Sequence, residues 1–179
     1  MDELLLLKPQ RYYDLRGFFE ETYNFNEFFK KGLEYKFVQD NRSVSIRSGT
    51  LRGLHFQAPP MAQGKLVRCG HGAIFDVAVD IRKGSPSYGN WRGFELSAEN
   101  GHQLFIPAGF AHGFLTLQPK SEIAYKCTHY FAPDLEGSLL WSSCGIQWPL
   151  DGEPVLGEKD LVAQAFEDFE SPFVYGRNC

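Results

Sequence analysis

Hydrophobic and polar residues alternate along many short stretches of the chain, and glycine or proline separates these stretches. The clearest alternation is in residues 74–81, where apolar Phe75, Val77, Val79 and Ile81 alternate with Asp76, Ala78 and Asp80. Because successive side chains of a strand point to opposite faces, the pattern predicts a strand with an apolar face and a face that carries acids. Similar reasoning predicts strands at residues 4–7, 18–23, 37–41, 51–57, 66–68, 91–96, 103–106, 114–117 and 123–131.

Only two segments have the spacing of a helix. The first follows Asn24, where three phenylalanines recur at helical spacing, Glu27 stands as in a capping box and Gly32 ends the segment. The second, residues 158–166, predicts a short helix that covers the barrel with Leu161, Val162, Ala165 and Phe166. Asn100-Gly101 is typical of a hairpin turn. Many short strands with little helix predict a mainly β fold, a cupin-like antiparallel β-barrel or double-stranded jelly roll.

Length and composition fit this fold and narrow the class of function. With 179 residues, the chain has the size of a single domain spanning residues 1–179. Aromatic residues make up 15% of it, which favours strands over a helical bundle. The formal net charge of −4 argues against a nucleic-acid or membrane surface, which normally needs a basic face.

The cysteines and the N-terminus indicate a cytoplasmic, soluble protein. Four widely spaced cysteines, Cys69, Cys127, Cys144 and Cys179, form no CxxC pair, so we expect reduced thiols and no zinc site. The apolar run at residues 4–7 is too short for a signal peptide or a spanning helix.

Two segments resemble the paired motifs of the cupin superfamily. The second motif is nearly complete as Gly101, Pro107, Gly109 and His112, with Thr116 in place of its asparagine. The first motif keeps Gly49 and His55, but Gln57 stands at its second histidine and its glutamate is missing. A catalytic metal usually needs about three protein ligands, and His55 and His112 supply two. We therefore expect no metal.

A histidine that binds no metal is available as an acid or a base near neutral pH. A lone histidine is more often a core residue satisfied by hydrogen bonds. Here, however, Arg52, Lys65 and His112 accompany His55, and four such groups inside one barrel would be costly as packing alone. Their concentration points to an anionic or enolate-forming ligand.

Several longer segments together resemble the dTDP-4-dehydrorhamnose 3,5-epimerase family. The resemblance runs in order from about Leu4 to Asp160 and is carried by residues 16–19, 37–41, 51–57, 65–68, 76–82, 106–114 and 125–126. It implies epimerisation of dTDP-4-dehydro-6-deoxy-D-glucose at C3 and C5 to dTDP-4-dehydro-L-rhamnose, a step of dTDP-L-rhamnose biosynthesis, without a cofactor.

The resemblance also implies roles for individual residues. His55 would be the base and Asp160 its oriented partner, with Asp151 as a weaker alternative partner. Lys65 would face the enolate oxygen, and Tyr125 would be the acid that protonates the opposite face. The residues implied in substrate binding are Arg16, Glu21, Gln39, Asn41, Arg52, His112, Glu136 and Lys159.

Members of the family are homodimers in which an N-terminal segment reaches the partner's nucleotide site, so Arg16 and Glu21 are expected to act across the interface. On their own, Arg16 could equally be a turn residue, and Gln39 and Asn41 could be strand-end hydrogen-bonding residues. The chain departs from the family pattern at residues 141–144 and 156–160, and the second departure includes Asp160.

Other functions remain open at this point. A relative that inverts only C3 or C5 of a related nucleotide 4-keto sugar would use the same base, cation and acid. A non-catalytic nucleotide-sugar-binding cupin and a metal-dependent cupin oxygenase are the alternatives from other classes.

Overall fold

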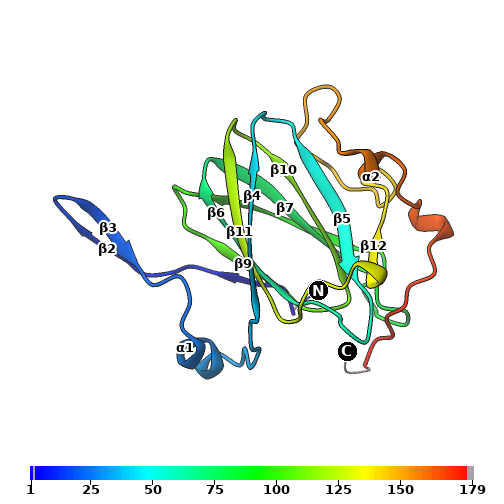
Figure 1. Ribbon diagram of the computed structural model, residues 1–179, viewed down its shortest axis with the longest axis horizontal. Helices are drawn as coiled ribbons and strands as arrows, with labels where there is room; N and C mark the ends of the chain where they lie inside the picture. Colours follow the sequence, from blue (N-terminus) through cyan, green and yellow to red (C-terminus); the bar gives the residue numbers. More distant parts are fainter. Residues whose placement is uncertain (2, 177–179) are drawn as a thin grey trace.

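The computed structural model describes Met1 and residues 3–176. Two five-stranded antiparallel sheets make up most of it (Figure 1). The first sheet has the order β1 (Leu5–Leu7), β9 (Gln103–Ile106), β6 (Lys65–His71), β11 (Ser121–Cys127) and β4 (Gln39–Ser45). The second has the order β12 (Glu136–Ser138), β5 (Leu51–Gln57), β10 (Phe110–Thr116), β7 (Ala73–Asp80) and β8 (Trp91–Ser97). The predicted mainly β, cupin-like architecture is confirmed.

The space between the two sheets is apolar at one end and polar at the other. At the apolar end, side chains from both sheets form a buried cluster, which includes Val67, Ile74, Leu104, Phe110 and Ile123. A second cluster packs the outer face of the second sheet under the C-terminal segments and includes Leu54, Val77, Ile146 and Phe173. Because both faces of the second sheet are covered, the acids of β7 are buried, not exposed to solvent.

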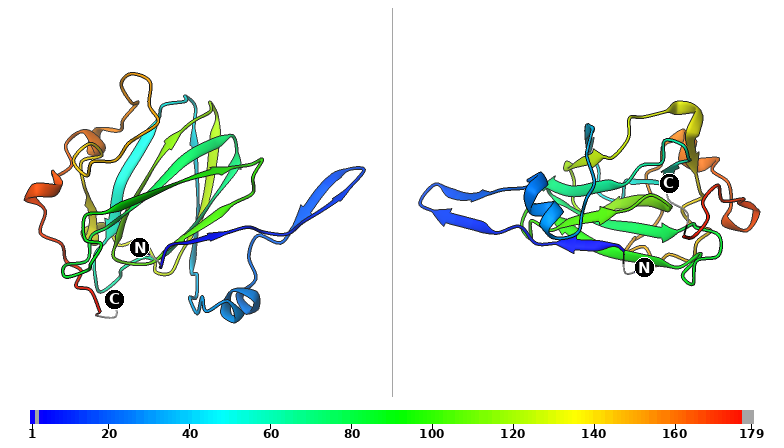
Figure 2. Two further views of the ribbon diagram at one scale, coloured as in Figure 1. Left: turned by 180° about the vertical axis from the view of Figure 1, so that it is seen from behind. Right: turned by 90° about the horizontal axis from the view of Figure 1, so that it is seen from below.

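The N-terminal part extends away from the barrel. A hairpin of β2 (Arg11–Asp14) and β3 (Gly17–Glu20) projects beyond the sheets, and α1 (Phe25–Lys30) follows it (Figures 1 and 2). Asn24 caps α1, because its Oδ1 accepts hydrogen bonds from the backbone of Asn26 and Glu27. The Glu27 carboxylate pairs with Lys30 and makes no return bond to Asn24, so only half of the predicted capping box forms.

Some predicted elements are wrong in extent or in pairing. The strand predicted at residues 18–23 ends at Glu20, and the one predicted at residues 123–131 ends at Cys127. The turn at Asn100-Gly101 does not close a hairpin, because β8 pairs with β7 and β9 pairs with β1 and β6. This turn instead carries the chain from one sheet to the other.

The helix predicted at residues 158–166 is also wrong. Only α2 (Glu158–Leu161) is helical, and Leu161 and Val162 are 61% and 83% exposed. The buried residue of α2 is Asp160.

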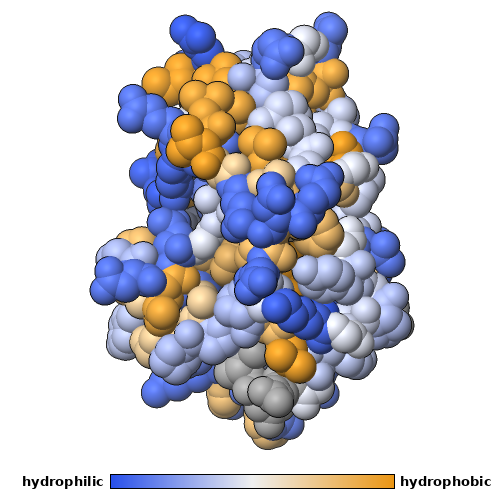
Figure 3. Space-filling model, turned by 90° about the vertical axis from the view of Figure 1, so that its right-hand side faces the viewer, coloured by the Kyte–Doolittle hydropathy of each residue, from blue (hydrophilic) through white to orange (hydrophobic). Residues whose placement is uncertain are grey.

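Figure 3, seen from the side of the C-terminal segments, shows hydrophobic side chains at the surface among hydrophilic ones. Two short 3-10 helices, η1 (Pro133–Leu135) and η2 (Phe166–Asp168), complete the elements.

Cys69, Cys127 and Cys144 are free thiols, and Cys179 lies outside the described residues. Within Met1 and residues 3–176, no helix is long and apolar enough to cross a membrane.

Candidate active site

An irregularity in the pairing of β5 with β10 shapes the site. His55 lies opposite His112 and Arg52 lies opposite Phe114, so β5 has two residues where β10 has only Gly113. Such a bulge breaks the alternation of side chains, and Arg52 and His55 consequently line the same cavity. Gly53 lies within the bulge at φ +126°, and a Cβ there would stand 2.5 Å from the Gly113 Cα.

The polar end of the barrel contains a cavity of about 480 Å³. Eight of the residues expected at the site line it: Arg52, His55, Lys65, His112, Tyr125, Glu136, Lys159 and Asp160. A neighbouring cavity of about 310 Å³ is lined by Gln39 and Asn41 and shares His55, Lys65, Tyr125 and Glu136 with the first. The two together form one continuous candidate site.

His55 is paired with Asp160 across more than a hundred residues of sequence. His55 Nε2 lies 2.6 Å from Asp160 Oδ1, and the Asp160 side chain is 5% exposed. Because a carboxylate only accepts hydrogen bonds, the pairing puts a proton on Nε2 and leaves the lone pair of neutral His55 on Nδ1. The histidine is therefore arranged as a base whose cation a carboxylate would stabilise.

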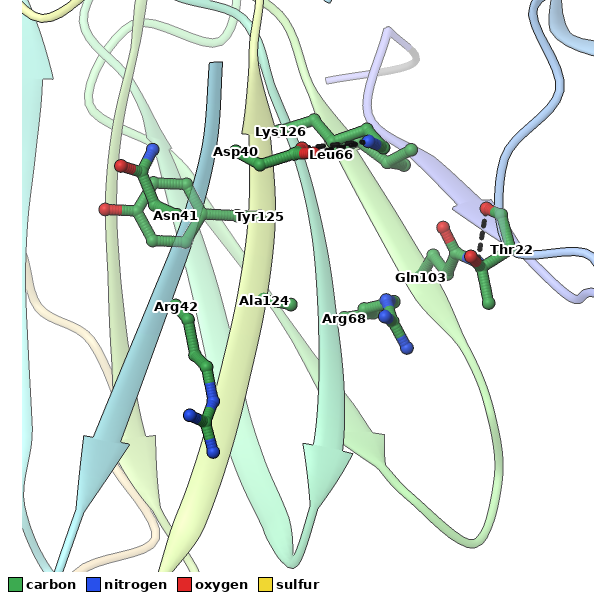
Figure 4. A pocket seen from close by; sticks show the side chains of 10 residues that line it. All are labelled: Thr22, Asp40, Asn41, Arg42, Leu66, Arg68, Gln103, Ala124, Tyr125 and Lys126. Carbon is green, nitrogen blue, oxygen red and sulfur yellow. Dashed lines mark hydrogen bonds and ion pairs between the residues drawn. The ribbon is translucent and has the colours of Figure 1, made fainter.

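Lys65 and Tyr125 come from the first sheet, opposite His55. Burial lowers the pKa of Lys65, while Cys127, Asp76 and Glu136 act to raise it. Burial raises the pKa of Tyr125, so its hydroxyl stays protonated and can donate. Figure 4 shows that Tyr125 and Asn41 lie together on one side of their strands.

The other faces of the same strands bear the Lys126–Asp40 pair, with the Lys126 Nζ 2.8 Å from Asp40 Oδ1 (Figure 4). Lys126, Arg42 and Arg68 line a further groove of about 310 Å³, whose lining also includes Asn41 and Tyr125.

A second histidine–aspartate pair lies beside the first. His112 Nε2 is 2.9 Å and 3.1 Å from the two carboxylate oxygens of Asp76, which is fully buried. His112 lines the larger cavity next to His55, its cross-strand partner.

Hydrogen bonds hold the polar side chains of the smaller cavity in place. The backbone N–H of Phe131 donates to Gln39 Oε1 at 2.8 Å, Gln39 Nε2 donates to Asn41 Oδ1 at 3.0 Å, and Asn41 Nδ2 reaches Cys127 Sγ at 3.5 Å. Glu136 and Lys159 form an ion pair of 2.7 Å between β12 and α2. These residues give the site an amide-rich end and a charged rim.

Two expected residues lie outside both cavities. Arg16, at the tip of the hairpin, is exposed and pairs with Asp14, while Glu21 accepts a hydrogen bond from Asn24. The structure therefore does not bring Arg16 and Glu21 to the site of their own chain.

Sequence reasoning missed Phe131 as a site residue and Asp76 as the partner of His112. Phe131 lines the smaller cavity and is half exposed, and its only signal is an aromatic residue after a strand. The sequence shows Asp76 only as one acid of a strand face, because a His–Asp contact between different strands has no local sequence signal.

Gln57 has a structural role. Its Oε1 accepts from the Ala132 backbone at 2.8 Å, and its Nε2 donates to the carbonyl oxygens of Met61 and Tyr130. Across the described residues, no group of three or more histidine, cysteine or acidic side chains is arranged to hold a metal ion.

Comparison with known proteins gives one consistent family. A family model described as dTDP-4-dehydrorhamnose 3,5-epimerase matches residues 1–168. A protein of this name from Salmonella typhimurium is 53% identical over 164 residues, which cover 90% of this chain and 89% of the relative. One from Sinorhizobium fredii is 51% identical over 175 residues, covering 97% and 90%.

Solved structures agree with this. A dTDP-6-deoxy-D-glucose-3,5-epimerase from Legionella pneumophila, in complex with dTDP-4-keto-L-rhamnose, superposes with a TM-score of 0.91 at 44% identity, covering 95% of this chain and 91% of that one. The Bacillus anthracis enzyme with TDP and PPi bound has a TM-score of 0.89 at 45% identity, covering 91% and 94%.

Proposed function

Because this chain belongs to the dTDP-4-dehydrorhamnose 3,5-epimerase family, we propose that it converts dTDP-4-dehydro-6-deoxy-D-glucose to dTDP-4-dehydro-L-rhamnose by inverting C3 and C5. It is an isomerase that acts on a carbohydrate. The observation that carries the proposal is the convergence of a carboxylate-paired histidine, a partly buried lysine and a partly buried tyrosine on one cavity. These three groups are what an enolate mechanism requires.

The first step removes a proton from the carbon next to the C4 carbonyl. His55 is the base, and its Nδ1 takes the proton because Nε2 is already bound to Asp160. The resulting imidazolium is stabilised by the buried carboxylate of Asp160, as in a catalytic His–Asp pair.

The electrons of the broken C–H bond move onto the C4 oxygen, which becomes an enolate. Lys65 is the cation that stabilises this oxygen, because it lines the cavity together with His55. A preorganised donor that meets developing charge in a site of low polarity is typically worth about 3 kcal/mol.

Inversion requires that the proton return to the opposite face of the sugar. His55 belongs to β5 of the second sheet and Tyr125 to β11 of the first, so a sugar held between them would be approached from both sides. Tyr125 is the acid, since burial keeps its hydroxyl protonated. Repeating the sequence at the second carbon completes the reaction.

The nucleotide binds at the amide-rich end of the site. Gln39 and Asn41 offer amide groups to the thymine, and Phe131 offers a ring for stacking, a contact worth about 1–3 kcal/mol per base. Arg52 and Lys159 supply positive groups for the diphosphate, and Glu136 orients Lys159. His112, whose Nε2 is bound to Asp76, turns its other ring atoms to the sugar. Arginine suits a bidentate hold on phosphate.

We also propose that the enzyme is a homodimer in which the hairpin of one copy completes the site of the other. The hairpin projects from its own barrel, and Tyr13, Leu15 and Phe19 on it are at least 70% exposed. Arg16 and Glu21 would then bind the partner's nucleotide. A mixture of the inactive variants Arg16→Ala and His55→Asn should recover activity if this holds, and should stay inactive if each chain supplies its own Arg16.

The chain is proposed to act as one cupin-like domain, in the cytoplasm, where its free cysteines would stay reduced.

The function is tested by turnover in deuterium oxide. Purified protein is incubated with dTDP-4-dehydro-6-deoxy-D-glucose, with and without a reductase that traps the product, and NMR measures label at each carbon. We expect deuterium at both C3 and C5 and an L-configured product. Label at one carbon alone would identify a single-centre epimerase, and no exchange at all would identify a binding module.

A further inference from the structure

We propose that Asp76 is a positioning residue of this site, which fixes the ring of His112 and provides the buried counter-charge for Lys65. This inference rests on the proposed function, because it assigns Lys65 the enolate-stabilising role. It adds a residue that neither touches the substrate nor lines the cavity.

The geometry starts with the position of Asp76 within the barrel. Asp76 lies in β7 between Ile74 and Ala78, two members of the apolar cluster between the sheets. Its carboxylate is fully buried and reaches His112 on the neighbouring strand β10 at 2.9 Å and 3.1 Å. Both oxygens therefore share a single N–H donor.

A single hydrogen-bond donor compensates only a small part of the cost of burying a carboxylate. Asp80, on the same face of the same strand and equally buried, is bonded by the side chains of Arg82, Ser85 and Ser87. Asp76 has only His112 among the described residues. Since an uncompensated buried charge is costly, a further positive group must stabilise Asp76.

Lys65 is that group. It comes from β6 in the facing sheet. Within the part of the chain that the structure describes, its ammonium group forms no hydrogen bond or ion pair with another side chain, although it lines the cavity. Burial lowers its pKa, and Asp76 is among the charges that oppose this effect. Because Asp76 contacts His112, and His112 and Lys65 line the same cavity, Asp76 and Lys65 are placed to compensate each other across the barrel.

Other groups also face Lys65. They are Cys127 and Tyr125 from β11, Glu136 from β12, Lys159 and Asp160 from α2, and Arg52, His55 and His112 from β5 and β10. Cys127 is a buried thiol whose pKa is raised by burial, so it is neutral near pH 7. Glu136 is already paired with Lys159, and Asp160 is bound to His55. Asp76 is thus the carboxylate left to balance Lys65.

The same carboxylate sets the tautomer of His112. Because Asp76 accepts from Nε2–H, neutral His112 has its lone pair on Nδ1. His112 borders His55 across the strand pair, so a rotated ring would change the surroundings of the base. One buried aspartate therefore holds two groups of the site in their working state.

The test is the variant Asp76→Asn, which keeps the shape and one acceptor oxygen but removes the charge. We expect kcat to fall by about tenfold or more while KM changes by less than about threefold. The basic limb of the kcat–pH profile should move to lower pH by about one unit, because Lys65 loses its counter-charge and gives up its proton sooner. In a Lys65→Met background, Asp76→Asn should lower kcat much less than in the wild type.

Asp80→Asn is the matched control, because it removes an equally buried aspartate of the same strand outside the cavity. It should lower thermal stability and leave the pH profile in place. A pH profile of Asp76→Asn that coincides with that of the wild type would overturn the proposal, as would an unchanged kcat.

A second measurement needs no variant. The ¹⁵N chemical shifts of His112 in the wild-type protein should show protonated Nε2 and unprotonated Nδ1, and the reverse tautomer would also overturn the inference. If the wild type catalyses no deuterium exchange, the proposed function fails, whereas exchange with an unchanged Asp76→Asn profile removes only the role of Asp76.

Discussion

Replacing Asp160 with asparagine tests the base directly. The asparagine side chain would have nearly the shape of the aspartate and could still accept a hydrogen bond from His55 Nε2, now 2.6 Å from the Asp160 oxygen. It would lack the negative charge that stabilises the imidazolium formed when His55 takes a proton. The substitution therefore removes one electrostatic interaction that grows during the reaction, with little change in packing.

The size of the effect follows from the geometry. Both side chains are largely buried, with 22% of His55 and 5% of Asp160 exposed. Two unit charges about 4 Å apart at an effective dielectric constant of about 20 interact by about 4 kcal/mol. A loss of this size corresponds to about a 1,000-fold lower rate, and the residual hydrogen bond of asparagine reduces it to about 100-fold or more.

Single-turnover exchange of the C3 and C5 protons in deuterium oxide measures this loss. Asp160→Asn should slow exchange by about 100- to 1,000-fold while KM stays within about threefold, because the interaction develops only in the transition state. Asp151→Asn is the control, since Asp151 is exposed and makes no contact with His55 among the described residues. A loss below tenfold for Asp160→Asn, or an equal loss for Asp151→Asn, would refute the reasoning.

Three further predictions concern the acid, the bulge and a buried carboxylate outside the cavity. Tyr125→Phe should reduce product formation by at least about 100-fold and reduce exchange of substrate protons much less, and equal losses by NMR would count against its role as acid. Gly53→Ala should destabilise the fold by about 3 kcal/mol, measured by urea unfolding, because its Cβ would lie 2.5 Å from the Gly113 Cα. Asp80 has its pKa lowered to about 2, despite desolvation, by Arg82, Ser85 and Ser87. The stability that this shift contributes is present above about pH 4 and is lost as the pH falls toward 2, so about 1 kcal/mol should be missing at pH 3. Asp80→Asn should not show this part of the acid-induced loss.

The strands of the barrel were predictable because burial imposes a period of two on them. The stretch 51–57 shows why: Leu54 and Phe56 pack under the C-terminal segments, and His55 faces the cavity. Pairing was less predictable. Asn100-Gly101 has the residues of a hairpin turn, yet the flanking strands join different sheets, because local turn chemistry does not specify the partner strand.

Site residues within the barrel strands were predictable from the cupin motifs and the family resemblance, which cover His55, Lys65, His112 and Tyr125. The bulge at Gly53 was not, because only the pairing with β10 shows that two residues oppose Gly113. Without it, Arg52 and His55 would point to opposite faces of a regular strand. The contact of Asp76 with His112 was not predictable for a similar reason, because the two residues belong to different strands.

The position of Asp160 shows how tertiary contacts replace local sequence signals. The segment from Val155 to Gln164 has little regular structure, but its two ends are held: Val155 bridges to Thr50, just before β5, and Gln164 bridges to Leu139. Leu139 in turn exchanges backbone hydrogen bonds with Leu54, next to His55. The segment is therefore stretched along β5, with α2 at its middle and Asp160 turned inward against His55. Helical periodicity could not predict this, because the anchors and the one buried carboxylate, not an apolar face, determine how the segment lies.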